Sequence, residues 1–345
     1  MAENINGVNH TVIVAPRRYG KSSLVNEVIH ENDVPHTWID LLTVSSGDEV
    51  TSKIIKGVSQ LIFQLSSDVK KLQLQVQKFF KSLNPEITIG LLGQSMTLHF
   101  NDEHSAAIEE ILIGLDKYAQ DMGKTAVIVF DEFQQICEFK ESAKIEAMIR
   151  HAVERSKAIT YIFSGSNRHL LADMFSSSHR PLYRLCQVMT IDRIVEADYY
   201  PFLQNVAREK WSKALSEETL RKIMFYTERH SFYINALCNK LWKQDNIPNE
   251  EDVTSSWDWY VNTHKSIIVS DLIDLSLNQK KLVSILAESP TTEVFGIDFL
   301  VKTNLSTSSI KQALEVLIKK DIVYKNEAGQ YQLLDPGVKY YILNH

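Results

Sequence analysis

The sequence predicts an α/β fold in which a parallel sheet is followed by a helical segment and then by a winged helix-turn-helix. Two observations support this prediction. In the N-terminal part, short apolar runs alternate with helical patterns, which is typical of a parallel sheet covered on both faces. The C-terminal part instead reads as three helices followed by two short strands around a glycine-containing turn.

Five apolar runs supply the expected sheet, because each has the length of a strand and most are separated by a helical pattern. Residues 86–100 carry two alternating runs separated by Gly93 and Gln94, which predicts a β-hairpin. Helices are expected from about residue 21 and over residues 49–82, 104–121 and 141–156. The expected strands are residues 11–14, 36–42, 126–130, 159–163 and 187–191.

The pattern changes near residues 195 and 275, which predicts three domains. In the helical segment, Ser216 with Glu218 close behind it predicts a capping box at a helix start. In the last segment, Ser306 is the expected N-cap of the third helix, and Gly329 suits the positive φ of the wing turn. The expected domains are an α/β domain over residues 1–194, a helical lid domain over 195–275 and a winged helix domain over 276–345.

Composition excludes several classes of protein. With 44% hydrophobic and 23% charged residues, the 345-residue chain is neither disordered nor fibrous, and its net charge of -6 excludes a uniformly basic surface. Cys137, Cys186 and Cys238 are far apart, so we expect neither a disulfide framework nor a zinc finger. No signal peptide and no long uncharged apolar run is evident. We therefore expect a cytoplasmic protein with no membrane contact.

A phosphate-binding loop is predicted directly after the first strand. The segment APRRYGKSS matches GxxxxGK(S/T), except that Ala15 replaces the first glycine. Backbone N–H groups and the positive end of the following helix favour a phosphate there, Lys21 would reach the β- and γ-oxygens, and the Ser22 hydroxyl would bind Mg²⁺. The predicted nucleotide-binding residues are Pro16, Arg17, Arg18, Tyr19, Gly20, Lys21, Ser22 and Ser23.

Two adjacent carboxylates follow the apolar run AVIVF. Asp131 and Glu132 would lie at the carboxyl edge of the sheet, where α/β proteins place their chemistry. We expect Asp131 to bind Mg²⁺ and Glu132 to act as the general base toward water. The alternative is that Asp131 and Glu132 are simply solvated residues at a strand end. The phosphate-binding loop upstream in the chain argues against this alternative. The pair predicts an NTPase rather than a passive nucleotide binder.

Further polar candidates follow the fourth strand. Ser164 opens the segment 164–167, which either senses the γ-phosphate or forms a simple turn. Phosphoryl transfer benefits from an arginine, for which Arg184 is the first choice and Arg180 the second; each has the alternative of pairing with a carboxylate on the surface. The predicted catalytic residues are Glu132, Lys21, Arg184 and Ser164.

The motifs APRRYGKSSL, VIVFDEFQ, FSGS and RPLYR occur in an order and spacing that resembles the archaeal-type ATPase family, within the STAND and AAA+ branch of P-loop NTPases. The resemblance extends over nearly the whole chain, through TERHSFYINALCNKLW to the winged helix. It implies ATP as the nucleotide with Mg²⁺, metal binding by Ser22 and Asp131, and Glu132 as the base. It also implies a sensor near Ser164 and a role for Arg184.

The chain departs from that family in three places. Only about ten residues precede the first strand, where the family usually carries a helical segment with a Gly-Arg-Glu box on the adenine side. Residues 228–231 read Glu-Arg-His-Ser where the family tends to read Gly-Gly-His-Pro. The glycine usual before the arginine is missing at Tyr183-Arg184. These departures concern adenine recognition, the lid's nucleotide contact and the position of the arginine.

The charge of the winged helix bears on its partner. Residues 279–345 contain eight lysines, no arginine and seven acidic residues, whereas DNA readers rely on several basic contacts and often on arginine. We therefore favour a lid, autoinhibitory or protein-docking role for the winged helix over DNA contact through residues 306–325, in which Lys311 and Lys319 would take part.

Three functions remain open. The first is an Mg²⁺-dependent, ATP-hydrolysing molecular switch whose nucleotide state controls self-association through the ATPase domain or binding of a protein partner. The second is a DNA-acting ATPase of a mobile element or defence system. The third is an adaptor that keeps ATP or ADP bound with little turnover.

Overall fold

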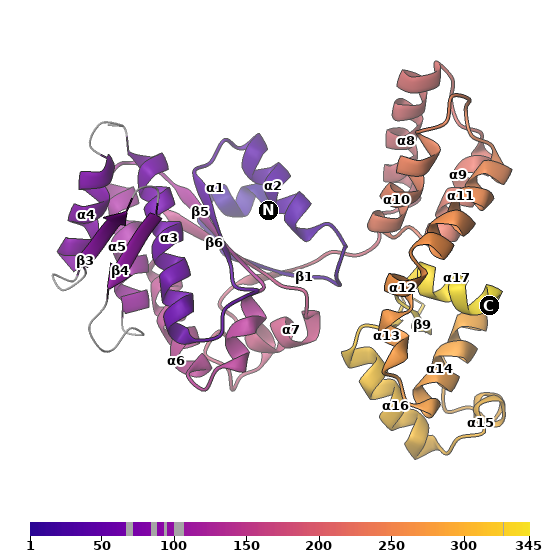
Figure 1. Cartoon of the computed structure of the whole chain (residues 1–345). Coiled ribbons are helices and arrows are strands. Elements are labelled where there is room, and N and C mark those ends of the chain that lie inside the picture. The colour runs from indigo at the N-terminus through magenta and orange to yellow at the C-terminus, as the bar shows by residue number, and fades with distance from the viewer. Residues whose placement is uncertain (67–71, 84–87, 93–94, 100–106, 327) are drawn as a thin grey trace. The chain divides into compact units, whose positions relative to one another are not determined.

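The computed structural model describes residues 1–66, 72–83, 88–92, 95–99, 107–326 and 328–345 (Figure 1). The chain divides into two compact units, Met1–Ile191 and Asp192–His345. Each unit has its own hydrophobic core, so each is described by itself. The first unit contains the sheet and the second contains the helical segment and the winged helix.

The first unit is built on a parallel sheet of five strands in the order β2-β5-β6-β1-β7. All five strands predicted from the sequence are present, and the α/β prediction is confirmed. The order places β6 between β1 and β5, which no local pattern in the sequence indicates. The strands are β1 (Thr11–Val14), β2 (His36–Asp40), β5 (Ala126–Asp131), β6 (Ile159–Ser164) and β7 (Gln187–Thr190).

Both faces of the sheet are covered, as its continuous apolar strands require. Helices lie on both faces of the sheet (Figure 1). Successive residues of β5 alternate between two cores: Val129 packs with residues of α1 and α2, whereas Phe130 packs with residues of α3, α5 and α6. The helices of this unit are α1 (Ala2–Asn6), α2 (Lys21–Glu31), α3 (Gly47–Leu65), α4 (Leu72–Leu83), α5 (Ala107–Asp121), α6 (Ser142–Arg155), α7 (Arg168–Ser176) and the 3₁₀ helix η3 (Phe133–Glu138).

Some expected elements differ in detail. The helical pattern over residues 49–82 corresponds to two helices, α3 and α4, and residues 67–71 between them lie outside the described part of the chain. The predicted hairpin is present as β3 (Thr88–Leu92) paired antiparallel with β4 (Ser95–His99), whereas its expected turn at residues 93–94 is not among the described residues.

The second unit joins the helical segment and the winged helix through one hydrophobic core. Trp257 of the helical segment is wholly buried in that core, which also includes Leu314 of the winged helix. The division into three domains stays a prediction. The elements are α8 (Glu196–Trp211), α9 (Glu217–Thr227), α10 (Ser231–Leu241), α11 (Glu250–Thr263), α12 (Lys265–Ile268), α13 (Ser270–Ile273), α14 (Leu277–Glu288), α15 (Ile297–Thr303), α16 (Thr307–Lys319), β8 (Val323–Lys325), β9 (Tyr331–Leu333) and α17 (Pro336–Asn344).

Helix caps test two local predictions. Ser306 caps α16 as expected, accepting a hydrogen bond from the Ser309 backbone N–H. Ser216 likewise caps α9, but the predicted capping box with Glu218 is wrong, because the third helical residue is Thr219 and its backbone N–H donates to Ser216. Because the third helical residue is not an acid, no carboxylate accepts from the Ser216 backbone N–H to complete a capping box.

No helix among the described residues is long and apolar enough to cross a bilayer.

The shared core of the second unit predicts cooperative unfolding. Replacing the buried Trp257 with alanine should lower the free energy of unfolding by about 3–5 kcal/mol, because it removes a large side chain from a packed interior. Trp259→Ala is the matched control: that indole is 46% exposed and contacts the Lys240 ammonium, so the loss should be about 1 kcal/mol or less. Urea denaturation followed by circular dichroism measures both, and equal losses would contradict the assignment of the core.

Candidate functional site

The phosphate-loop segment connects β1 to α2. Gly20 is the N-cap of α2 and has φ 85°, a left-handed conformation that favours glycine. No side-chain cap accepts from the first turn of this 11-residue helix, and a Cβ added at Gly20 would meet nothing within 4 Å. The first turn of α2 thus has no side-chain cap, and it follows a strand and a loop, the arrangement in which backbone N–H groups can bind an anion.

The predicted loop residues have distinct environments. The Lys21 side chain is buried at 9% exposure and its Nζ donates to the backbone oxygens of Ala15 (3.1 Å) and Pro16 (2.9 Å). Lys21 thus lies along the inside of the loop. Pro16 and Tyr19 are buried, whereas Arg17, Arg18, Ser22 and Ser23 are exposed.

The acidic pair lies where β5 ends. Asp131 is the last residue of β5, and its Oδ1 accepts hydrogen bonds from the Ser164 hydroxyl (2.6 Å) and the Glu132 backbone N–H (3.1 Å). Ser164 ends the neighbouring strand β6 and is itself buried. The structure therefore brings two predicted site residues, Asp131 and Ser164, into direct contact.

Glu132 is fixed by groups on both sides. It takes the left-handed conformation (φ 51°), which is uncommon for a residue with a side chain. Its Oε2 accepts from the Ser166 hydroxyl (2.7 Å), the Ser166 backbone N–H (3.2 Å) and Gln134 Nε2 (2.6 Å). Gln134 reaches this position only because residue 165 is glycine: a Cβ there would lie 1.8 Å from Gln134 Oε1.

These contacts determine the ionisation of Glu132. Burial raises the pKa of its carboxyl, but hydrogen bonds from Gln134 and Ser166, together with the positive charge of Lys21, outweigh burial and lower the pKa below its ordinary value. Glu132 is therefore a carboxylate at neutral pH. The action of Lys21 on Glu132 also relates the loop after β1 to the acidic pair after β5.

The donor set suits a magnesium nucleotide. Within the described ranges, no group of three or more His, Cys, Asp and Glu side chains is arranged to hold a metal ion. Mg²⁺ in nucleotide sites requires only one or two protein oxygens, because phosphates and water complete its octahedron. The uncapped first turn of α2, the exposed Ser22 hydroxyl and the Asp131 carboxylate fit that requirement.

The two candidate arginines lie in different environments. Arg184 is exposed, has φ 55°, and places its guanidinium 5.0 Å from the centre of the Tyr183 ring. Arg180 instead pairs with a carboxylate, its Nη2 lying 2.7 Å from Glu146 Oε1. Arg180 is therefore paired with a carboxylate, which was the alternative to a catalytic role. The carboxylate belongs to Glu146, which is wholly buried and not on the surface as expected.

The segment that departs from the family pattern lies in the second unit. Glu228 accepts hydrogen bonds from Arg193 Nη1 (2.8 Å) and from Lys339 Nζ of α17 (2.6 Å). Arg193 also donates to the Leu334 backbone oxygen (2.8 Å), and the Tyr233 hydroxyl donates to Asp335, the N-cap of α17, at 2.7 Å. Glu228 thus binds the helical segment to the winged helix.

Two residues of the site were not assigned from the sequence. Ser166 lies in the polar segment 164–167, where the sequence favours Ser164; the structure shows that Ser164 contacts Asp131 and that Ser166 contacts Glu132. Gln134 belongs to the VIVFDEFQ motif but received no role. An amide two residues after the carboxylate, followed in the chain by a Ser-Gly-Ser turn, is the pattern that would have indicated both.

Comparisons with known proteins agree with this architecture. Residues 269–344 match a family described as a probable winged helix domain. The Walker-type ATPase PABY2304 of Pyrococcus abyssi has a similar structure, with a TM-score of 0.68 and 17% identity, over 98% of this chain and 91% of that one. The Aeropyrum pernix ORC2 protein, solved as ADPNP–ADP complexes, gives 0.58 and 12%, over 99% and 90%. No curated protein matches the sequence.

These likenesses define the class of fold. The chain has the fold of the Walker-type ATPase of Pyrococcus abyssi and of the Aeropyrum pernix ORC2 protein, and its C-terminal part matches a probable winged helix domain.

The Glu228 contacts predict a pH-dependent stability of the second unit. Burial raises the pKa of Glu228, but the hydrogen bonds from Lys339 and Arg193 and their charges lower it below the ordinary value. A lowered pKa adds stability that is present above about pH 4 and is lost as the pH falls through the folded-state pKa. Glu228→Gln should therefore cost about 1–3 kcal/mol at pH 7.

The cost of Glu228→Gln should shrink as the pH falls below about 4 and through the lowered folded-state pKa, because the wild-type carboxylate becomes protonated there. Denaturation across pH 3–8 measures it, with the exposed Glu217→Gln, which loses only an exposed pair with Arg221, as the matched control. A cost that does not change with pH would contradict the ionic origin of this contact.

Proposed function

We propose that this protein is an Mg²⁺-dependent ATPase that acts as a molecular switch, in which the nucleotide state controls self-association or the binding of a partner. The observation that carries the proposal is the held pair of carboxylates. Asp131 is fixed by Ser164, the last residue of β6, and Glu132 by Ser166 of the turn that follows, while Lys21 of the loop acts on Glu132 through its charge. A protein that only binds nucleotide does not need an oriented, ionised glutamate there.

The loop residues would bind the phosphates. Gly20 lets the backbone approach closely, the N–H groups of the first turn of α2 would donate to the β-phosphate, and Lys21 would exchange its carbonyl partners for phosphate oxygens. Ser22 and Asp131 would hold Mg²⁺, which supplies charge neutralisation of the phosphates when it is bound. Asp131 would keep its orientation through the Ser164 hydroxyl.

Glu132 would orient water and accept its proton. Its lowered pKa keeps the carboxylate ionised and able to accept, and Ser166 with Gln134 fixes its direction. Arg184 would contribute positive charge toward the transferred phosphoryl group, for which an exposed guanidinium is suited.

The similar structures support this proposal at the level of fold. The Pyrococcus protein is named a Walker-type ATPase, and the Aeropyrum protein was solved with ADPNP and ADP. Both are below 25% identity, so ATP as the nucleotide rests on the loop and on the resemblance of the motifs.

DNA contact through the winged helix is the second candidate, favoured by the family match over residues 269–344. Lys311 and Lys319 lie exposed on α16, but Glu315 is exposed on the same helix. A winged helix that binds a protein or regulates the ATPase is therefore the first proposal.

Two substitutions separate binding from turnover. Lys21→Ala should weaken the binding of ATP and abolish hydrolysis, because the positive charge inside the loop is lost. Glu132→Gln should keep ATP binding and lower turnover by at least about a hundredfold, because the oriented base is removed. Calorimetric titration, phosphate release and size-exclusion profiles in ATP and ADP measure these effects, each with and without duplex DNA.

Glu138→Gln, at an exposed position at the end of η3, is the matched control and should behave as the wild type. If turnover survives Glu132→Gln, or if the wild-type protein binds ATP without hydrolysing it, the proposed enzymatic function is contradicted. A nucleotide-bound adaptor would then be the remaining function. Assembly that is the same in ATP and ADP would remove the switch.

A further inference from the structure

The segment that carries Arg184 lies between α7 and β7 and has no regular secondary structure of more than a turn. Turn-like hydrogen bonds give it a local shape: the Tyr183 backbone N–H donates to the Arg180 oxygen (3.2 Å), and the Arg184 N–H to the Phe175 oxygen (3.0 Å). Leu182, in the middle of the segment, is wholly buried in the hydrophobic core, whereas Arg184 is exposed. The position of Arg184 therefore depends on what the rest of the segment contacts.

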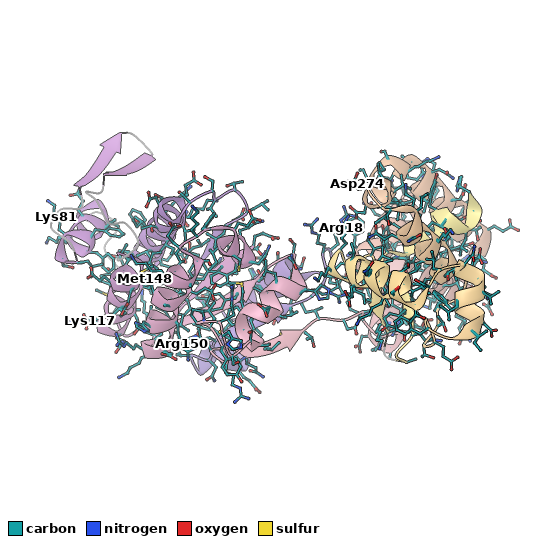
Figure 2. All side chains as sticks on the ribbon, turned by 90° about the horizontal axis from the view of Figure 1, so that it is seen from below. Arg18, Lys81, Lys117, Met148, Arg150 and Asp274 are labelled. Atoms are coloured by element: carbon teal, nitrogen blue, oxygen red, sulfur yellow. The ribbon has the colours of Figure 1, made fainter. Side chains whose placement is uncertain are left out.

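Helix α6 supplies two of those contacts. Arg150, which is labelled in Figure 2, lies in the second half of α6. It donates through Nη1 to the Tyr183 backbone oxygen (3.0 Å) and to the Pro181 backbone oxygen. Glu146, one turn earlier on the same helix, pairs with Arg180 at 2.7 Å. One helix face thus holds the segment through its backbone and through a side chain, immediately before Arg184.

The Glu146–Arg180 pair has an unusual environment for an ion pair. Glu146 is 0% exposed and the Arg180 side chain is 24% exposed. Neither carboxylate oxygen of Glu146 has a hydrogen-bond partner of good geometry among the residues that the structure describes. Burial raises the pKa of Glu146 to about 7, Arg180 opposes that rise and Asp173 adds to it. A pair so buried and so poorly hydrogen-bonded is weak evidence for stability, so its presence calls for another explanation.

Arg180 also reaches the acidic side of the site. Its Nη2 lies 2.7 Å from Cys137 Sγ, and Cys137 belongs to η3, the helix that begins directly after Glu132. Arg180 is therefore in contact with α6 and with η3 while it belongs to the segment that carries Arg184. A single side chain connects the element after the proposed base to the segment of the proposed arginine.

We propose that Glu146 and Arg180 are positioning residues that hold Arg184 where it can act on the phosphates of ATP. The inference rests on the proposed ATPase function and adds two residues to it. Neither residue touches the nucleotide in this account: Glu146 anchors Arg180, and Arg180 fixes the segment against α6 and η3. Loss of the pair should let Arg184 move while the phosphate loop and the acidic pair stay in place.

The first test measures the segment without nucleotide. Hydrogen exchange of the amides of residues 182–185 should become at least about tenfold faster in Glu146→Gln, because the anchor of Arg180 is weakened. Glu109→Gln is the matched control: Glu109 also pairs with an arginine of α6, Arg155, at 3.4 Å, but on α5, away from this segment. Its exchange over residues 182–185 should match the wild type.

The second test separates binding from turnover and compares backgrounds. In Glu146→Gln, kcat should fall roughly ten- to hundredfold while the Kd for ATP, titrated calorimetrically, stays within about twofold. In an Arg184→Ala background the same change should cost less than about twofold, since there is then no arginine left to position.

Removing one partner of a buried pair can also unfold a protein, so a second variant is needed. The double substitution Glu146→Leu with Arg180→Met replaces the pair by apolar side chains of similar size, and should retain the wild-type circular dichroism spectrum. It should show the same faster exchange and the same loss of kcat. A folded double variant with wild-type exchange and wild-type kcat would overturn the proposal.

The outcomes also distinguish the two proposals. Equal losses on Glu146→Gln in the wild-type and Arg184→Ala backgrounds would overturn the positioning role while leaving the ATPase intact. Hydrolysis unaffected by Lys21→Ala and Glu132→Gln would overturn the proposed function itself. The exchange measurement needs no hydrolysis, so unchanged exchange at residues 182–185 would overturn the positioning pair whatever the turnover.

Discussion

The position of β6 between β1 and β5 is the constraint on which the site depends. Parallel pairing aligns Ile13 with Ser164 on one side of β6, and Phe130 with Phe163 on the other. The phosphate loop and the acidic pair therefore emerge two strands apart at one edge, with the end of β6 between them. Ser164 at the end of β6 contacts Asp131 across a single strand gap, at the edge where α/β sheets bind their ligands.

Ser164 and Ser166 show how this edge is organised. Ser164 ends β6, and Ser166 follows two residues later in the turn after the strand; they bind Asp131 and Glu132, respectively. Gly165 between them admits Gln134, which completes the support of Glu132. The turn after β6 is therefore part of the acidic site, and the positive φ of Glu132 is maintained by contacts on both sides.

The second unit is organised by charge as well as by its core. Glu228 replaces what the resembling family usually has as glycine, and it takes a left-handed conformation that glycine would adopt at less cost. Its contacts with Arg193 and Lys339 offset that cost. The replacement of the family's usual glycine by Glu228 therefore adds ion pairs that join the helical segment to the winged helix.

Much of the fold could be predicted from the sequence, since the apolar runs of the five strands and the glycine-lysine-serine loop are local patterns. Strand order could not, because pairing between strands distant in sequence leaves no periodic mark. The same limit applies to side-chain partners: Asp131 and Glu132 are evident as a pair, whereas the bonds to Ser164 and Ser166 require the fold. Arg180 was ambiguous because its partner, Glu146, is 34 residues away in the chain.

If the turn after β6 sets the ionisation and direction of Glu132, Ser166→Ala should change the pH dependence of hydrolysis. Removing the Ser166 hydroxyl deletes one hydrogen bond to the carboxylate and should raise the pKa of Glu132. The acid limb of kcat should then move about one pH unit higher than in the wild type, since a hydrogen bond to a charged group is worth about 1.5 kcal/mol or more. An acid limb that stays at the wild-type pH would contradict the account.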